Sequence, residues 1–334
     1  MRAFISKEPR PIEEEPLAEV EVADPVPGPD EVRIKISTCG VCHTDLHVIE
    51  GELPPKKLPI IPGHEIVGIV DATGGKVSRF KVGDKAGAAW LHSTCGECEF
   101  CLRSNENLCE KARFTGYDVD GGYAQYTVVP ENFAYSVPDG CSDLEAAPLL
   151  CAGIIGYRAL RLSDIEKGGR LGLYGFGASA HIVIQVATYW NCEVYVFSRS
   201  EEHRQLARKL GAVWTGRAED DPPVKLQSAI IFAPAGKLVR DALRVLEKGG
   251  TLALAGIYMT PIPELDYEKH LYHEKTVKSV ANSTRKDAED ILSLAAEIPI
   301  RTEIQEFALH DVNRALILLK QGRIKGAGVL RISA

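Results

Sequence analysis

The chain has 334 residues, a formal net charge of -7 at pH 7, 45% hydrophobic residues and 25% charged residues. That length is about twice that of an ordinary domain, so we expect two domains, each with its own core. The composition excludes a disordered chain, and the acidic balance argues against a nucleic-acid partner, which would need clustered lysine and arginine.

The N-terminal sequence MRAFISKEPRPIEEEP has no apolar core of signal-peptide length. No uninterrupted apolar run approaches the roughly 18 residues that indicate a membrane span. We therefore expect a cytoplasmic protein with no membrane partner. The nine cysteines are then better explained by metal sites or free thiols than by a secreted disulfide framework.

The first half of the chain, from Val20 to about Pro138, has the pattern of β-structure. Short β-branched runs such as EVRIKIS and YTVV are separated by proline and glycine. Within this half, CGVCHTDLH supplies Cys42, and PGHEIVG supplies His64 beside Glu65. One thiolate and one imidazole make half of a catalytic zinc site of the Cys2His kind, which keeps a fourth position open.

A third protein ligand is needed for such a site. Cys151 in PLLCAG is a distant candidate. On its own, this cysteine is more simply interpreted as a small buried hydrophobic residue, since free cysteine is among the most buried residue types.

Four further cysteines form the pattern C-x2-C-x2-C-x7-C: Cys95, Cys98, Cys101 and Cys109. Four thiolates in one short segment suit a closed tetrahedral zinc that stabilises the fold and takes no part in chemistry. An iron–sulfur cluster is the competing interpretation, but the proline after the last cysteine and the x3 gap are missing. Buried free thiols would require this spacing to arise by chance.

The second half changes to strand, glycine turn, helix and strand. RLGLYGFG, AHIVIQVATYW and EVYVFS make one βαβ unit, and SAIIFA and GTLALAGI are further strands. A helix is expected over KLVRDALRVLEKG, residues 237–249. This alternation predicts a doubly wound parallel sheet. Two more helices, around DAEDILSLAA and DVNRALILLK, follow from about Ser283 onward.

Gly175, Gly177 and Ala180 spell G-x-G-x-x-A between a strand and a helix. Small residues there allow a tight turn and bring backbone N–H groups close to the pyrophosphate of a dinucleotide. The motif alone would be a weak signal, and its position after a strand strengthens it.

The end of the next strand bears on the choice of cofactor. An NAD-specific domain usually has Asp or Glu about 20 residues past the glycines. Here Ser198 occupies that place and Arg199 follows it, so the carboxylate is absent and a guanidinium is available for a phosphate. NADP is therefore favoured over NAD. In the alternative, Glu201 or Glu202 reaches back to the ribose and Arg199 is a solvated charge.

Several motifs in this order resemble the zinc-dependent alcohol dehydrogenases of the medium-chain dehydrogenase/reductase family. They are VCHTDLH, then G-H-E-x2-G-x5-G-x2-V from Gly63 to Val77, then the four cysteines and the glycine turn. The resemblance covers essentially the whole chain. It implies an α/β protein with a GroES-like β-rich catalytic domain, residues 1–150 and 283–334, and a Rossmann domain, residues 151–282. The zinc lobe would span about residues 91–112.

The resemblance also implies two zinc ions per chain. A catalytic zinc would be held by Cys42, His64 and Cys151, and a structural zinc by the four clustered cysteines. Cys39, although spaced as C-x2-C with Cys42, is expected to be a free thiol. Asp45 would orient a zinc ligand, where a turn or cap aspartate is the alternative, and Glu65 would be a close neighbour of the metal, where a surface charge is the alternative.

Further roles follow from the resemblance. Thr44 would hydrogen-bond the ionised alcohol and His47 would pass its proton to solvent; without the resemblance, His47 is as readily a surface residue. His43 would touch the cofactor pyrophosphate or face solvent. Trp90 would line the substrate pocket or belong to the core. Gly256 and the later VANS stretch resemble positions that hold the nicotinamide amide.

The function implied is hydride transfer between a nicotinamide cofactor and a small-molecule alcohol or aldehyde, by a homodimer or homotetramer. A sorbitol-type polyol dehydrogenase is an alternative, although that group usually has Glu at the third ligand position. A non-catalytic dinucleotide-binding protein is another, because a fold does not guarantee a function. The family commonly has a basic clamp for the pyrophosphate near the C-terminus, where this chain has Gly or Ala; Lys325 and Arg331 are the candidates to replace it.

Overall fold

The computed structural model describes residues 1–333, and the chain separates into two compact units. The first unit comprises Met1–Cys151 and Thr284–Ala334, and the second comprises Ala152–Ser283. The first segment of the first unit ends at Cys151 and the second unit ends at Ser283. The expected ends were residues 150 and 282, so each boundary lies one residue from the expected one. No helix among the described residues is long and apolar enough to cross a membrane.

A seven-stranded sheet forms the centre of the first unit. Its strands run in the order β16-β17-β3-β4-β5-β9, with β8 also paired to β3, and all pairs are antiparallel except β16 with β17. Alternation explains β3, because Val32, Ile34 and Ile36 all point into the core and are fully buried. The bounds are β3 Glu31–Val41, β4 Glu65–Thr73, β5 Lys85–Ala88, β8 Tyr126–Pro130, β9 Ala134–Ser136, β16 Ile304–Ala308 and β17 Ala327–Arg331.

Short elements complete this unit. Two small antiparallel pairs join β1 to β2 and β6 to β7, and α1 and α10 contribute apolar residues to the same core as the large sheet. The bounds are β1 Arg2–Ile5, β2 Ala18–Glu21, β6 Leu91–Ser93, β7 Arg113–Phe114, α1 His43–Ile49, α2 Glu99–Leu102, α3 Asp143–Ala146, α9 Arg285–Glu297 and α10 Val312–Lys320. Short 3-10 helices lie at Ile12–Glu14, Glu106–Leu108, Glu131–Phe133, Ala147–Leu150 and Leu309–Asp311.

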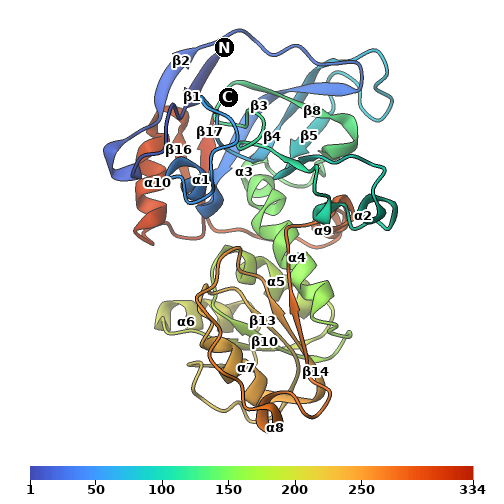
Figure 1. Cartoon of the computed structure of the whole chain (residues 1–334), viewed down its shortest axis with the longest axis vertical. Helices are drawn as coiled ribbons and strands as arrows, with labels where there is room; N and C mark the ends of the chain where they lie inside the picture. Colours follow the sequence, from blue (N-terminus) through green and yellow to red (C-terminus); the bar gives the residue numbers. More distant parts are fainter. Residues whose placement is uncertain (334) are drawn as a thin grey trace. The chain divides into compact units, whose positions relative to one another are not determined.

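The second unit is a six-stranded parallel sheet with strands in the order β12-β11-β10-β13-β14-β15. This confirms the predicted doubly wound sheet. Figure 1 labels β10, β13 and β14 of this sheet, together with helices α4 to α8 of the same unit. The strands are β10 Arg170–Tyr174, β11 Glu193–Phe197, β12 Trp214–Gly216, β13 Leu226–Ile231, β14 Leu246–Leu254 and β15 Thr276–Ser279. The helices are α4 Ala152–Leu162, α5 Ala178–Tyr189, α6 Glu201–Lys209, α7 Leu238–Val245 and α8 Tyr267–His270.

Both faces of this sheet are buried, as a parallel sheet requires. Tyr174, Phe197 and Ile231 lie in one row across β10, β11 and β13. They share a core cluster with residues of α7. The neighbouring row, which contains Leu173, is equally buried on the alternate face.

One predicted boundary was wrong. The helix expected over residues 237–249 ends at Val245, and Leu246 begins β14 opposite Leu226. Gly249 has a φ of +76°, in the left-handed region, and Gly250 follows it. Both glycines lie beyond the end of the helix, within β14. The helix ends because Leu246 pairs with Leu226 of β13, so the chain turns into the sheet four residues earlier than the apolar spacing suggested.

His92 on β6 is a histidine with only 6% of its surface exposed, and its Nδ1 has no hydrogen-bond partner among the described residues. Burial, aided by the nearby charge of Arg113, lowers the pKa of His92 from 6.5 to about 4. Between these pH values the unfolded chain binds the proton and the folded chain does not. The free energy of unfolding must therefore fall as the pH is lowered through this range.

We predict that His92→Phe makes the stability of the protein less sensitive to acid. The histidine should cost up to about 3 kcal/mol of stability between pH 6.5 and 4, and the variant should lose this dependence. Urea unfolding at a series of pH values measures it. His310→Gln is the control, because the side chain of His310 is 75% exposed. Equal pH dependence in His92→Phe and the wild type would contradict the prediction.

Candidate metal centre and cofactor site

Cys42, His64 and Cys151 reach one point in the first unit from three segments. Cys42 follows β3 and caps α1, His64 immediately precedes β4, and Cys151 follows the 3-10 helix Ala147–Leu150. Their ligand atoms, together with a carboxylate oxygen of Glu65, all lie within 4.8 Å of one another. The Sγ atoms of Cys42 and Cys151 are 3.7 Å apart. The structure thus brings together the four residues that the sequence placed at the metal.

The carboxylate of Asp45 organises this group. Its Oδ1 accepts hydrogen bonds from His64 Nδ1 at 2.9 Å and from the Gly63 N–H at 3.2 Å. Its Oδ2 accepts from the Cys42 N–H and the Tyr123 hydroxyl, both at 2.9 Å. Since Nδ1 donates, the lone pair of His64 lies on Nε2, which is buried and has no hydrogen-bond partner among the described residues. An unpartnered imidazole nitrogen beside two sulfur atoms fits a zinc ion.

The charges at this point also suit a cation. The hydrogen bond with the Cys151 thiol is the largest cause that holds the pKa of Cys42 well below its ordinary value, so the pair of cysteines carries a thiolate. Burial, together with the Cys42 thiolate, raises the pKa of Glu65 well above its ordinary value. A divalent ion would relieve this accumulation of buried negative charge.

Helix α1 carries the other polar candidates. The Thr44 hydroxyl oxygen accepts a hydrogen bond from Cys42 Sγ at 3.7 Å, which places the hydroxyl directly beside the metal ligands. His47 lies one turn further along, partly exposed, with Nδ1 against the carboxylate of Glu52. His43 is exposed at the start of the helix. Helix α1 begins at this point because of a capping box, in which Cys42 Sγ and the Asp45 carboxylate each accept a hydrogen bond from a backbone N–H at the helix start.

Trp90 lies against His64 with its ring edge-to-face, the ring centroids being 5.1 Å apart. It also stacks on Phe114 at 5.2 Å and on Tyr117 at 5.9 Å. These three aromatic rings form an apolar wall, and Trp90 is the ring of this wall that contacts a metal ligand. Trp90, which the sequence predicted to line the substrate pocket or to belong to the core, thus contacts His64, whereas Phe114 and Tyr117 were not predicted.

The four clustered cysteines also converge. Sγ–Sγ distances are 3.5 Å for Cys98–Cys101, 3.6 Å for Cys95–Cys109 and 3.9 Å for Cys95–Cys101. A tetrahedral zinc with Zn–S bonds of about 2.3 Å needs sulfur atoms roughly 3.8 Å apart. Backbone N–H groups of Glu97 and Cys98 point at Cys95 and lower its pKa to about 6, which favours the thiolate that a metal needs. This lobe therefore fits a closed four-sulfur site.

In the second unit, the glycine motif occupies the turn between β10 and α5. Gly175 has a φ of +87°, which favours glycine. Gly177 caps α5, and Ala180 is fully buried one turn into that helix. A helix start with free backbone N–H groups after a parallel strand is the arrangement that binds a pyrophosphate.

Lys325 and Arg331 are the two candidates for a basic residue that binds the pyrophosphate from near the C-terminus. Of these, Arg331 is already paired with Glu306, at 2.5 Å and 3.0 Å.

Ser198 directly follows β11 and is buried, while Arg199 is exposed. An arginine that was not predicted, Arg204, donates to the carbonyl oxygen of Ser198 at 2.6 Å and to Glu201 Oε2 through Nε at 3.0 Å. Arg208 donates to the other oxygen of Glu201 at 2.7 Å. Both carboxylate oxygens of Glu201 are therefore held by arginines of its own helix.

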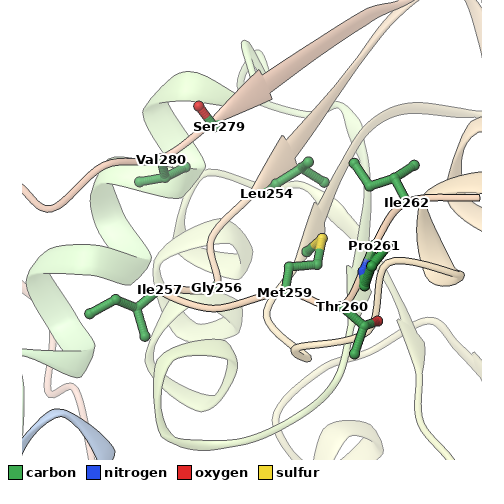
Figure 2. Close-up of a pocket in the computed structure, with 9 residues that line it drawn as sticks. All are labelled: Leu254, Gly256, Ile257, Met259, Thr260, Pro261, Ile262, Ser279 and Val280. Atoms are coloured by element: carbon green, nitrogen blue, oxygen red, sulfur yellow. The ribbon is translucent and has the colours of Figure 1, made fainter. Parts of the chain in front are cut away.

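Gly256 lines a cavity of about 350 Å³ in the second unit (Figure 2). The walls come from the loop after β14 and from the end of β15, and they are mostly apolar. The lining residues are Leu254, Gly256, Ile257, Met259, Thr260, Pro261, Ile262, Ser279 and Val280. A small planar ring with one polar group would fit such a space.

Some residues of these sites were not predicted from the sequence, and only some of them have a spacing that could have revealed them. Arg204 and Arg208 lie three and seven residues after Glu201, a spacing that puts charges on one helix face. Tyr123 and Tyr117 carry no comparable signal. They reach the centre only through the pairing of distant segments.

Two family models match this chain. Residues 28–139 match the alcohol dehydrogenase GroES-like domain, and residues 178–297 match the zinc-binding dehydrogenase domain. The first match lies within the first unit, and most of the second lies within the parallel-sheet unit. Together they support the predicted combination of a GroES-like domain with a Rossmann domain.

Individual proteins agree with these matches. A probable alcohol dehydrogenase, AdhA, of Mycobacterium tuberculosis is 49% identical, over 99% of this chain and 97% of the relative. The solved structure of CAD from Helicobacter pylori, complexed with NADP(H), has a TM-score of 0.86 at 29% identity and 99% coverage of both chains. Acetophenone reductase from Geotrichum candidum, solved with NAD, has a TM-score of 0.86 at 26% identity and covers 99% and 97% of the two chains.

Proposed function

The chain belongs to the zinc-type alcohol dehydrogenases of the medium-chain dehydrogenase/reductase family, and on that premise we propose a zinc-dependent, NADP-preferring alcohol dehydrogenase or aldehyde reductase. The observation that carries the proposal is the open donor set of Cys42, His64 and Cys151 beside an apolar wall. Three protein ligands leave a fourth position for the oxygen of a substrate.

The predicted site residues of the first unit would have different roles. Cys42, His64 and Cys151 hold the zinc, which when bound supplies a Lewis acid for the oxygen of the substrate. The Thr44 hydroxyl hydrogen-bonds that oxygen and takes part in moving its proton. His47, partly exposed and backed by Glu52, passes the proton to solvent. Glu65 stays a close neighbour of the metal, and the four clustered cysteines hold a second, structural zinc.

The apolar wall favours one class of substrate. Trp90, Phe114 and Tyr117 stack at the centre, and such a surface binds an apolar or aromatic group better than a chain of hydroxyls. A polyol would leave hydroxyls without partners there. Together with Cys151 at the third ligand position, this favours an apolar alcohol or aldehyde over the polyol alternative.

The second unit would bind the dinucleotide. The turn at Gly175, Gly177 and Ala180 takes the pyrophosphate, with His43 of the first unit as an additional contact. The cavity beside Gly256 takes the nicotinamide. Hydride transfer to or from the nicotinamide is then the chemistry of the cofactor itself.

The structural neighbours do not decide between NADP and NAD, because one was solved with NADP(H) and another with NAD. The proposed NADP preference therefore rests on the residues after β11. Arg199 is exposed, and its guanidinium would bind the ribose phosphate of NADP. The alternative required Glu201 or Glu202 to reach the ribose, and Glu201 is held by Arg204 and Arg208. Freeing its carboxylate would cost those charge-assisted contacts.

A homodimer or homotetramer remains part of the proposal, and so does a cytoplasmic location. The molecular mass in solution decides the first of these. A monomeric mass by light scattering would exclude the proposed assembly.

The two zinc sites should respond differently to substitution. Cys42→Ser should remove about one equivalent of zinc and abolish turnover, because the open site loses one of three protein ligands. Cys98→Ser should remove the other equivalent and chiefly lower thermal stability, because a closed site contributes folding free energy. Metal analysis, turnover and thermal unfolding of both variants test this. Full activity and unchanged zinc in Cys42→Ser would refute the assignment.

His47→Gln should slow alcohol oxidation by a factor of about 100, and small amine bases in the buffer should restore part of the rate. His310→Gln on the exposed surface is the control and should behave as the wild type. If amines do not accelerate the His47 variant more than the control, the residue is not a proton relay.

Replacing Ser198 with Asp and Arg199 with Gln should shift the ratio of kcat/KM for NAD over NADP by at least about tenfold, since one charge-assisted contact contributes roughly 1.5–3 kcal/mol. Glu202→Gln serves as the control, and it should leave the ratio unchanged. Two results would count against the proposal: a strong NAD preference in the wild type, or loss of NAD use in Glu202→Gln.

A further inference from the structure

Tyr123 is fully buried, and its hydroxyl donates to Asp45 Oδ2 at 2.9 Å. Burial and the charge of Asp45 raise the pKa of this phenol well above its ordinary value, so it keeps its proton and remains a donor. Tyr123 touches none of the reacting groups named above. It contacts the residue that orients His64.

The backbone fixes Tyr123 relative to His64. Residues 121–123 hydrogen-bond to residues 61–63: Gly121 N–H to Ile61 at 2.7 Å, Gly122 N–H to Gly63 at 2.9 Å and Tyr123 N–H to Pro62 at 2.9 Å. The tyrosine ring also fills the space that a side chain at position 63 would take. A Cβ added to Gly63 would lie 2.5 Å from Tyr123 Cδ1. The phenol is therefore held against the segment that ends in the metal ligand.

Four donors surround the Asp45 carboxylate. Two are backbone N–H groups, one is the ligand His64 itself, and the fourth is Tyr123. Without the phenol, Oδ2 would retain only the Cys42 N–H, and the carboxylate would rotate more freely about its Cβ–Cγ bond. That rotation would weaken the hydrogen bond that keeps His64 Nε2 aimed at the two sulfur atoms.

We propose that Tyr123 is a positioning residue of the catalytic metal centre, acting through Asp45 on His64. The inference rests on the proposed zinc at Cys42, His64 and Cys151. It adds an outer residue that holds the orienting carboxylate. Partners of this kind affect metal affinity although they never touch the metal.

The chain offers a matched control. Tyr174 in the second unit is also fully buried, but its hydroxyl has no hydrogen-bond partner among the described residues. Tyr123→Phe and Tyr174→Phe thus remove the same atom from the same kind of environment. Only the first removes a hydrogen bond.

The test is the rate at which a strong chelator removes zinc from each purified full-length variant. Tyr123→Phe should release one of the two zinc equivalents about tenfold faster than the wild type, at the low end of the range for such partners. The other equivalent should be unchanged, and Tyr174→Phe should match the wild type throughout. In cobalt-substituted protein, Tyr123→Phe should also alter the visible absorption of the catalytic site. Equal release rates in Tyr123→Phe and Tyr174→Phe would overturn the proposal.

Thermal unfolding with and without zinc separates positioning from packing. A purely structural role for Tyr123 would lower the stability of the metal-free and zinc-loaded forms alike and leave zinc release unchanged. Positioning should instead reduce the additional stability that zinc provides.

Combining Tyr123→Phe with Asp45→Asn tests whether Tyr123 acts on His64 through Asp45. Asn has an acceptor at only one of the two positions that Oδ1 and Oδ2 occupy, so His64 and Tyr123 cannot both donate to it as they donate to Asp45. Tyr123→Phe should therefore add little to Asp45→Asn. Additive effects of the two substitutions would overturn the route through Asp45. A wild-type protein that holds no zinc at Cys42 would refute the proposed function itself. Two bound zinc ions with equal release rates in Tyr123→Phe and Tyr174→Phe would instead refute only the role of Tyr123.

Discussion

A buried carboxylate must have its oxygens satisfied, and at Asp45 this requirement brings together the segments that carry Cys42 and His64. The side chain is 2% exposed. An ionised carboxylate in such a place is tolerated only with several hydrogen bonds to it. The donors that Asp45 collects come from the end of β3, from the segment before β4 and from the segment before β8. Satisfying one charge therefore draws together the segments that supply Cys42 and His64.

The same atoms serve helix formation and metal chemistry. Cys42 caps α1 through its sulfur atom, and Asp45 completes the capping box through Oδ2. The helix start and the ligand geometry are thus specified by one short motif. Substituting either residue would disturb both the local fold and the donor set, which explains why so short a helix can hold Thr44 and His47 in fixed positions.

The sequence predicted much of this architecture because its strongest signals are local. The C-x2-C-x2-C-x7-C spacing and the G-x-G-x-x-A turn each lie within one segment, and the structure gives both the expected geometry. What could not be predicted depends on long-range pairing. Tyr123 reaches Asp45 through hydrogen bonds between residues 121–123 and 61–63, and the early end of α7 at Val245 depends on Leu246 pairing with Leu226. Neither contact has a signature within its own segment.

The first unit is assembled from both ends of the chain, and this has a consequence for biosynthesis. The second unit is one continuous segment, Ala152–Ser283, so it can close its sheet while the ribosome is still adding residues. Strand β17 pairs with β3, with Leu330 opposite Cys39, and it is synthesised after the whole of the second unit. Bringing such distant residues together carries a loop-closure cost, which a completed second unit reduces by holding the intervening chain compact. Strand β3, which leads directly into Cys42, therefore gains its partner β17 only after the second unit has been synthesised.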